Sequence, residues 1–181
     1  MIRTFVAHVE DRPGVLNRVV SLFRRRGYNI ESLTVGTTDQ EGVSRLTVVM
    51  EADDDGARRI EANLYKLVNV LYVEDLSRTA TVTRDLALLK VRATSETRPQ
   101  ILQLAEVFGA RAVDVTTEAL VLEMTGAADK IDSLIEVLRP FGILEMVRTG
   151  IVAMRRGAAD GAIQNHITTG ARMSERLLKA S

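Results

Sequence analysis

The sequence predicts an α+β protein with two consecutive domains, each in the order βαββαβ that defines the ferredoxin-like arrangement. Segments in which apolar residues alternate, as in strands, are interspersed with segments in which apolar residues have helical spacing. This order of segments occurs twice, and 181 residues suffice for two small domains. We therefore expect a first domain at residues 1–76, a second at residues 77–156 and a tail at residues 157–181.

The first domain is expected to begin with a strand at residues 2–10, because apolar side chains alternate there. The helix that follows is expected to run to about Arg26, with Asp11 as its cap and Pro13 in its first turn, where a missing N–H costs nothing. Gly27 is the residue type that ends helices in the left-handed conformation.

The next strand, from about Tyr28, has an alternation that slips by one residue between Ile30 and Leu33, which predicts a β-bulge. Three further elements complete the domain: a strand at residues 43–50, a helix that starts at Asp53-Asp54-Asp55, and a strand at residues 68–76.

The second domain repeats this order with little residue identity to the first. Helices are expected to end at Gly109 and before Pro140. The expected strands cover residues 82–93, 112–115, 119–124 and 143–154. The tail is rich in Gly, Ala, Ser and Thr, a composition typical of mobile terminal segments.

Composition excludes several classes of protein. The chain has no cysteine and only two histidines, His8 and His166, so we expect no metal site and no thiol chemistry. A net charge of zero gives no general attraction to nucleic acid or to an anionic membrane, and aromatic residues are too few for an RNA-binding sheet. The sequence also lacks a membrane-spanning run, a signal peptide and any common catalytic motif, which predicts a cytoplasmic protein that is not an enzyme on its own.

The most distinctive residues are Asp11, Pro13 and Gly14 at the expected helix start, with Asn29 just beyond the helix end. A helix start offers free N–H groups to a carboxylate, and a glycine lets a ligand approach the backbone. Asp11 can accept a hydrogen bond from an ammonium group, and Asn29 can donate and accept. These residues predict a site for a small zwitterion such as an amino acid.

Each of these residues also has a purely structural interpretation, as a cap, a tight turn and a helix exit, and the residues alone leave this alternative open. Arg24-Arg25-Arg26 resembles a basic patch, but compensation of the helix dipole explains it without a ligand. His8 falls on the sheet face opposite the apolar residues, where we expect it to contact solvent or a partner rather than act as a base.

Residues 10–19 and 22–35, which include the run RRGYNIESLTV, resemble the small regulatory subunit of acetolactate synthase, also called acetohydroxyacid synthase. The similarity continues through residues 64–70, 84–91 and 148–150 and covers residues 1 to about 156. The PGVL element within it is shared more widely among ACT domains.

This resemblance implies that the first domain is an ACT domain, and that two copies pair and bind a branched-chain amino acid, usually valine, between them. The effector site would combine Asp11, Pro13, Gly14, Val15 and Leu16 of one copy with Asn29 and Ile30 of the other. The resemblance also implies a partner, the large catalytic subunit, which would carry the thiamine diphosphate, magnesium and FAD, so that this chain holds no cofactor.

The function expected from this resemblance is activation of the large subunit and feedback inhibition by valine in branched-chain amino acid biosynthesis. The alternative is a stand-alone amino-acid sensor that acts on another partner.

Overall fold

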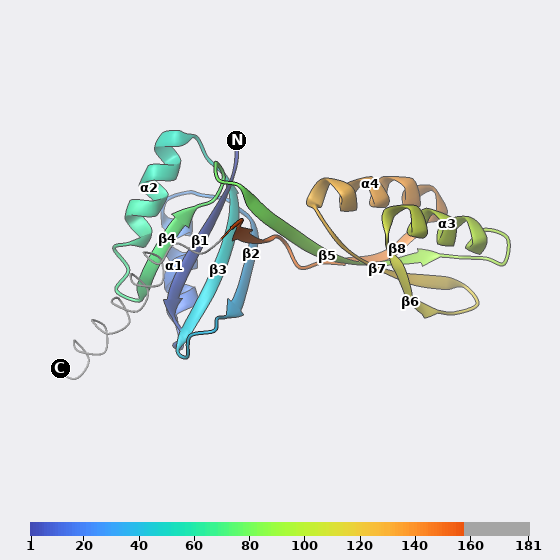
Figure 1. Cartoon of the computed structure of the whole chain (residues 1–181), viewed down its shortest axis with the longest axis horizontal. Coiled ribbons are helices and arrows are strands. Elements are labelled where there is room, and N and C mark those ends of the chain that lie inside the picture. The colour runs from blue at the N-terminus through green and yellow to red at the C-terminus, as the bar shows by residue number, and fades with distance from the viewer. Residues whose placement is uncertain (158–181) are drawn as a thin grey trace. The chain divides into compact units, whose positions relative to one another are not determined.

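The computed structural model describes residues 1–157, so the expected tail lies outside the described residues apart from its first residue. Figure 1 shows the chain, whose contacts divide it into two compact units. The first unit comprises residues 1–82 together with the described residues from Ala153 onward, and the second comprises residues 83–152.

The first unit has the expected order βαββαβ, and its four strands form one antiparallel sheet in the order β2-β3-β1-β4. The outer strands of this order are β2 and β4. Its elements are β1 (Ile2–Glu10), α1 (Val15–Arg25), β2 (Ile30–Thr37), β3 (Val43–Glu51), α2 (Asp54–Leu64) and β4 (Val70–Asp75).

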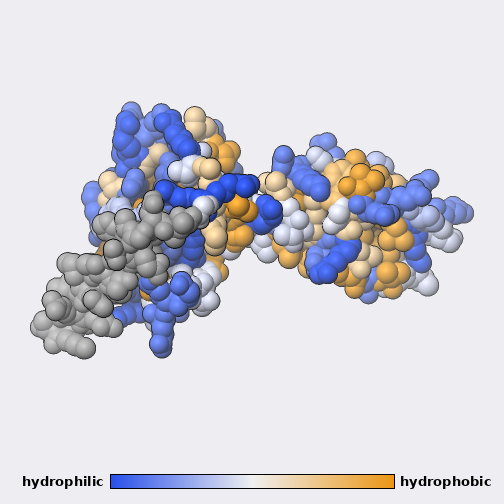
Figure 2. All heavy atoms as spheres, in the orientation of Figure 1, coloured by the Kyte–Doolittle hydropathy of each residue, from blue (hydrophilic) through white to orange (hydrophobic). Residues whose placement is uncertain are grey.

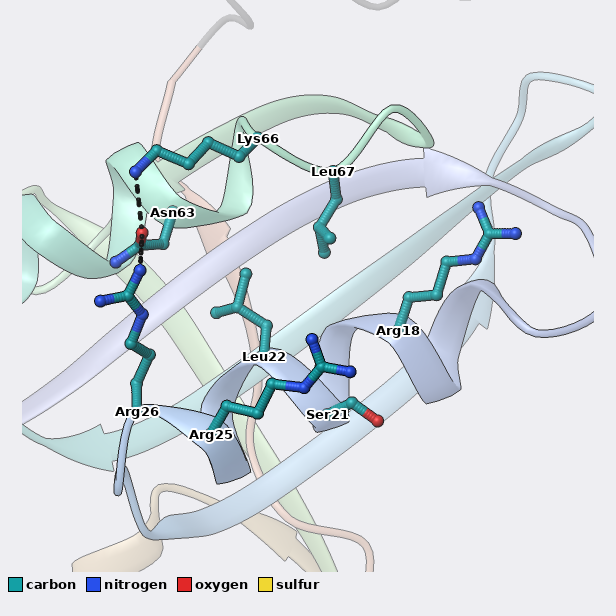
Figure 3. A pocket seen from close by; sticks show the side chains of 8 residues that line it. All are labelled: Arg18, Ser21, Leu22, Arg25, Arg26, Asn63, Lys66 and Leu67. Atoms are coloured by element: carbon teal, nitrogen blue, oxygen red, sulfur yellow. Dashed lines mark hydrogen bonds between the residues drawn. The ribbon is translucent and has the colours of Figure 1, made fainter.

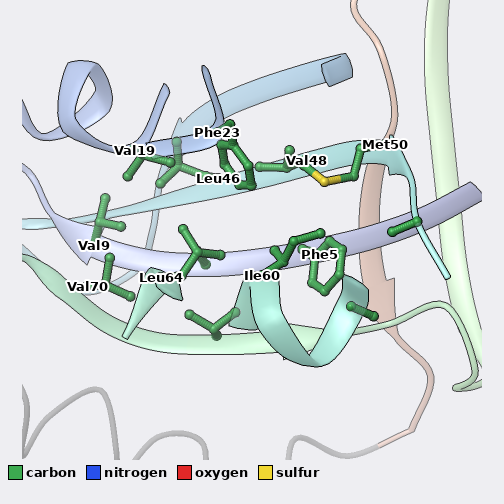
Figure 4. Packing of buried hydrophobic residues seen from close by; sticks show 14 of the residues in the cluster. Phe5, Val9, Val19, Phe23, Leu46, Val48, Met50, Ile60, Leu64 and Val70 are labelled. Atoms are coloured by element: carbon green, nitrogen blue, oxygen red, sulfur yellow. The ribbon is translucent and has the colours of Figure 1, made fainter. Parts of the chain in front are cut away.

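Both helices of the first unit pack on the same face of its sheet, as the close view of the buried side chains shows (Figure 4). Full burial of each such side chain stabilises the fold by about 1.5–3 kcal/mol. The core residues labelled in that view come from the strands and from both helices: Phe5, Val9, Leu46, Val48, Met50, Val70, Val19, Phe23, Ile60 and Leu64.

Two local expectations for this unit are confirmed. The register of β2 against β3 shifts between Ile30 and Ser32, which is the predicted irregularity. At the start of α2, an oxygen of the Asp53 carboxylate accepts a hydrogen bond from the N–H of Gly56 at 2.6 Å, so the acidic run caps the helix.

The second unit also contains two helices and an antiparallel sheet, in the order β6-β7-β5-β8. Its elements are β5 (Thr81–Arg92), α3 (Arg98–Phe108), β6 (Arg111–Val115), β7 (Ala119–Gly126), α4 (Ala128–Leu138), a 3-10 turn (Arg139–Phe141) and β8 (Ile143–Arg148). The two units are therefore both ferredoxin-like, as predicted.

The prediction of a single closing strand at residues 143–154 is wrong, because the chain forms two strands there, β8 and β9 (Val152–Arg155). Gly150 between them has φ +83°, and an extended strand cannot continue through that conformation. β9 pairs with β5, apart from the other strands of the sheet. Its Ala153 carbonyl accepts a hydrogen bond from the Arg45 guanidinium at 2.5 Å, within the first unit.

A buried ion pair fastens β8 to the start of the second unit. Asp85 is only 3% exposed, and its Oδ2 lies 2.6 Å from Nη2 of Arg148. The same guanidinium contacts Asp132 of α4 at 2.5 Å, and the Thr149 hydroxyl donates to Asp85. Sheet and helix are thus joined by one cation.

Hydrophilic residues cover the visible part of α2, whereas the visible face of the second unit carries many hydrophobic ones (Figure 2). Exposed large apolar residues of the second unit include Val107, Val113, Val115, Val137 and Val147.

None of the helices within residues 1–157 is both long enough and apolar enough to span a bilayer.

Candidate functional site

The start of α1 differs from the expected capping arrangement. Gly14 is the residue at the N-cap, in the left-handed conformation with φ +85°, and no side-chain cap hydrogen bond forms within the described part of the chain. Asp11 is exposed, and its backbone N–H donates to the Gly42 carbonyl at 2.8 Å. The predictions that Asp11 caps the helix and that Pro13 lies in its first turn are therefore wrong. A turn closed by a 3.3 Å hydrogen bond from Val15 to Arg12 comes first, and it places Pro13 before the helix.

This helix start is open to a ligand. The first turn contains no acidic residue. Apart from the chain neighbours of Gly14, no heavy atom of the described residues lies within 4 Å of the position that a Cβ on Gly14 would occupy. The first N–H groups of a helix lack partners within the helix. Among the described hydrogen bonds, no acceptor is assigned to the N–H of Leu16 or Asn17, so two donors point out of the helix start.

The second group of candidate residues lies at the other end of α1. Asn29 is exposed, and Ile30 is the first residue of β2 and packs partly against the core. Gly27, with φ +71°, turns the chain from the helix toward this strand, as predicted. The 11 residues of α1 correspond to about 16 Å of helix, so one chain holds the two groups apart.

His8 lies on the sheet face opposite the apolar core, as predicted. In the sheet, His8 pairs with Arg45 on β3 and with Tyr72 on β4. The ring centroids of His8 and Tyr72 lie 6.0 Å apart. Burial lowers the pKa of His8 to about 4, and the positive charge of Arg45 acts in the same direction, while Asp39 opposes it. The imidazole is therefore neutral at pH 7, and it belongs to neither group of candidate site residues.

The sequence does not predict a cavity of about 270 Å³ between α1 and the end of α2 (Figure 3). Its basic residues include Arg18 and Lys66, which are distant in sequence. The run Arg24-Arg25-Arg26 is the one sequence signal for it, and its last two residues line the cavity. No cluster of three or more potential metal-ligating residues occurs within residues 1–157.

Comparison with known proteins decides the family. The acetolactate synthase small subunit of Mycolicibacterium smegmatis is 47% identical to this chain over 149 residues, which make up 82% of this chain and 88% of the relative. The chain belongs to the acetolactate synthase small-subunit family. Its counterpart in Bacillus subtilis is 42% identical over 166 residues, covering 91% of this chain and 96% of the relative.

Two family models match this small subunit, one in each of its ferredoxin-like parts. The model described as an AHAS small subunit-like ACT domain matches residues 5–72, and the model described as the small subunit of acetolactate synthase matches residues 84–157. The crystal structure of the acetolactate synthase small subunit from Thermotoga maritima superposes with a TM-score of 0.81 at 38% identity, covering 88% of this chain and 99% of that one. Both groups of candidate residues lie within the ACT match.

Proposed function

We propose that this small subunit binds the catalytic large subunit of acetolactate synthase, raises its activity and confers feedback inhibition by valine. The observation that supports an effector site shared by two copies is the placement of its halves. The open helix start at Gly14 and the exposed Asn29 lie at opposite ends of α1, so a single chain cannot offer both to one small ligand.

A second copy would complete the site. β2 is an outer strand of the first sheet, and Asn29 and Ile30 lie at its beginning. Two outer strands can pair around a two-fold axis, which makes the same patch on each copy the interface. In such a homodimer, Asn29 of one copy approaches the start of α1 in the other, and two equivalent sites form.

The residues suit a neutral zwitterion. The effector carboxylate would accept hydrogen bonds from the N–H groups of Leu16 and Asn17 at the positive end of the helix dipole. The Asp11 carboxylate would attract the effector ammonium, and Asn29 of the second copy could bond to either group. The aliphatic side chain of valine would lie beside Ile30 of that copy.

The catalytic chemistry belongs, in this proposal, to the large subunit, which would hold the thiamine diphosphate, magnesium and FAD. It would join two pyruvates, or pyruvate and 2-oxobutyrate, into 2-acetohydroxy acids with release of carbon dioxide. For valine to inhibit, it must bind more tightly to the less active state of the complex, and a coupling of about 1–3 kcal/mol is typical.

The test mixes the pure small subunit with its large subunit and measures acetolactate formation with and without valine. We expect a higher rate on mixing and a valine-dependent decrease of that rate. Unchanged rate and valine response would contradict the proposal. Valine binding without any effect on the synthase would instead favour the stand-alone sensor, and acetolactate formation by the small subunit alone would make it an enzyme.

A further inference from the structure

The cavity between α1 and the end of α2 is surrounded by cationic side chains. Arg18, Arg25 and Arg26 project from α1 and the turn after it, and Lys66 projects from the segment after α2 (Figure 3). The other lining residues are uncharged, namely Ser21, Leu22, Asn63 and Leu67. Among residues 1–157, the lining of the cavity therefore contains four cations and no anion.

Compensation of the helix dipole explains only some of the cationic residues that line the cavity. That effect is confined to the last turn of a helix, which in α1 contains Arg24 and Arg25. Arg24 does not line the cavity, whereas Arg18, the fourth residue of α1, does. Lys66 comes from another element altogether. The cations gather around the cavity rather than around the end of one helix.

Two of these cations converge on one neutral atom. Oδ1 of Asn63, a residue 8% exposed, accepts hydrogen bonds from Nη2 of Arg26 at 3.3 Å and from Nζ of Lys66 at 3.2 Å. The two cationic nitrogens therefore lie within about 6.5 Å of each other. Like charges at this separation repel, and an anion between them relieves the repulsion.

The remaining two cations also have donors left over. The Arg18 guanidinium donates a hydrogen bond to the Asn69 amide oxygen at 2.7 Å, and that amide in turn donates to Glu10. Within residues 1–157, the side chain of Arg25 has no hydrogen bond or ion pair. Guanidinium groups present paired N–H donors that match the oxygens of a phosphate.

We infer that this cavity binds a small ligand with two neighbouring phosphate groups. A phosphate group carries a charge of about −1.5 to −2 at pH 7, so two of them balance four cations, whereas a single carboxylate does not. A volume of about 270 Å³ suits a small molecule. Leu22 and Leu67 form an apolar part of the lining that could contact the rest of the ligand.

This site shares no residue with the proposed valine site. The valine site uses the segment from Asp11 to Leu16 and the start of β2, whereas the cavity opens between the two helices that cover the sheet. Phosphate binding here would give the small subunit a second ligand site, whether or not valine is its effector.

The test measures binding of inorganic diphosphate to the full chain by calorimetry at constant ionic strength, with inorganic monophosphate for comparison. The test variant is Arg25→Gln with Lys66→Gln. Its matched control is Arg24→Gln with Arg58→Gln, which removes two exposed cations that do not line the cavity. We expect tighter binding of diphosphate than of monophosphate, about ten-fold or more weakening in the test variant, and change within about two-fold in the control.

The inference would be overturned by no preference for diphosphate, by unchanged binding in the test variant, or by equal weakening in both variants, which would mean general charge attraction only. Reduced affinity of the test variant for the large subunit, without diphosphate binding by the parent chain, would also overturn it and would assign the cationic surface to a protein contact. The circular dichroism spectrum of each variant checks that both remain folded.

Discussion

Gly14 has room for a side chain but a backbone conformation that few residues adopt. Within residues 1–157, no heavy atom beyond its chain neighbours lies within 4 Å of the position of a Cβ on Gly14, yet its φ of +85° is strained for any residue with a Cβ. Asn and Asp tolerate this conformation better than other residues do, and they have nearly the same shape. The pair of variants Gly14→Asp and Gly14→Asn therefore separates the effect of charge from the effect of strain.

We expect Gly14→Asp to abolish valine inhibition while activation of the large subunit persists. A carboxylate at the helix start would repel the effector carboxylate by about 1–4 kcal/mol at a separation of about 4 Å. Gly14→Asn should retain measurable valine binding, because it adds the same bulk without the charge. Calorimetry with valine checks both variants, and equal valine affinity of the parent and Gly14→Asp would place the effector elsewhere.

His8 makes stability depend on pH. Its pKa is about 4 in the folded chain and 6.5 in the unfolded chain, because burial and Arg45 disfavour the imidazolium. The unfolded chain therefore takes up a proton below pH 6.5 that the folded chain refuses. The full contribution to stability is present above pH 6.5 and is lost as pH falls toward 4.

We expect the variant His8→Gln to lose less stability than the parent chain between pH 7.5 and pH 5. The difference should be about 1 kcal/mol, after allowance for the partial exposure of the ring to solvent. Urea unfolding at the two pH values measures it, and parallel loss of stability in both proteins would show that His8 does not titrate in this way.

At the scale of elements, the sequence pattern predicted each helix and strand from β1 to β4. The bulge in β2 was visible as a slip in alternation, and the cap at Asp53 as a run of acids. The start of α1 was mispredicted, because capping propensity cannot show that a turn through Gly14 comes first. The break at Gly150 was missed for a similar reason, since the apolar pattern continues on both sides of it.

Because Asp85 and Arg148 form a buried ion pair, we expect the substitution Arg148→Ala to lower the stability of the second unit strongly. Arg148→Ala removes the cation that pairs with Asp85, a carboxylate only 3% exposed. Such a loss typically lowers the free energy of unfolding by about 3 kcal/mol or more. The control is Lys90→Ala, which removes an exposed pair with Glu145 in the same sheet and should cost less than about 1 kcal/mol.

Amide hydrogen exchange in β5 and β7 is the appropriate measurement, because a chain with two compact units need not unfold in one step. Faster exchange for Arg148→Ala than for Lys90→Ala is expected. Similar exchange in the two variants would mean that solvent compensates Asp85, and that the pair orients β8 without stabilising it.

At the scale of the whole molecule, the residue pattern selected the residues of the proposed site, whereas the expectation that two copies share it came from the family resemblance. Motif spacing selects Gly14 and Asn29, yet the length of α1 separates them in one chain, and only a second copy could bring them together. The cationic cavity was not predictable from pattern, because Arg18 and Lys66 line one cavity only when α1 and the end of α2 pack on the same face of the sheet.

A shared site makes a strong prediction for mixed dimers. Gly14→Asp damages the half of the site at the helix start, and Asn29→Ala weakens the half contributed by the other copy. When both variants are in one dimer, both changes fall in the same site, and the second site combines the unchanged Gly14 of one chain with the unchanged Asn29 of the other. Two variants that each bind valine poorly should therefore restore part of the binding when mixed.

With random pairing, half of the dimers are mixed and each has one intact site, so about a quarter of the parent number of sites should return. Calorimetry of valine binding after co-refolding measures this number, and sedimentation of each variant alone checks that it still forms dimers. Parent-like affinity at the restored sites is expected, because both of their halves are unchanged. If the variants form mixed dimers but no valine binding returns, each chain binds valine by itself. The two ends of α1 would then not be halves of one shared site.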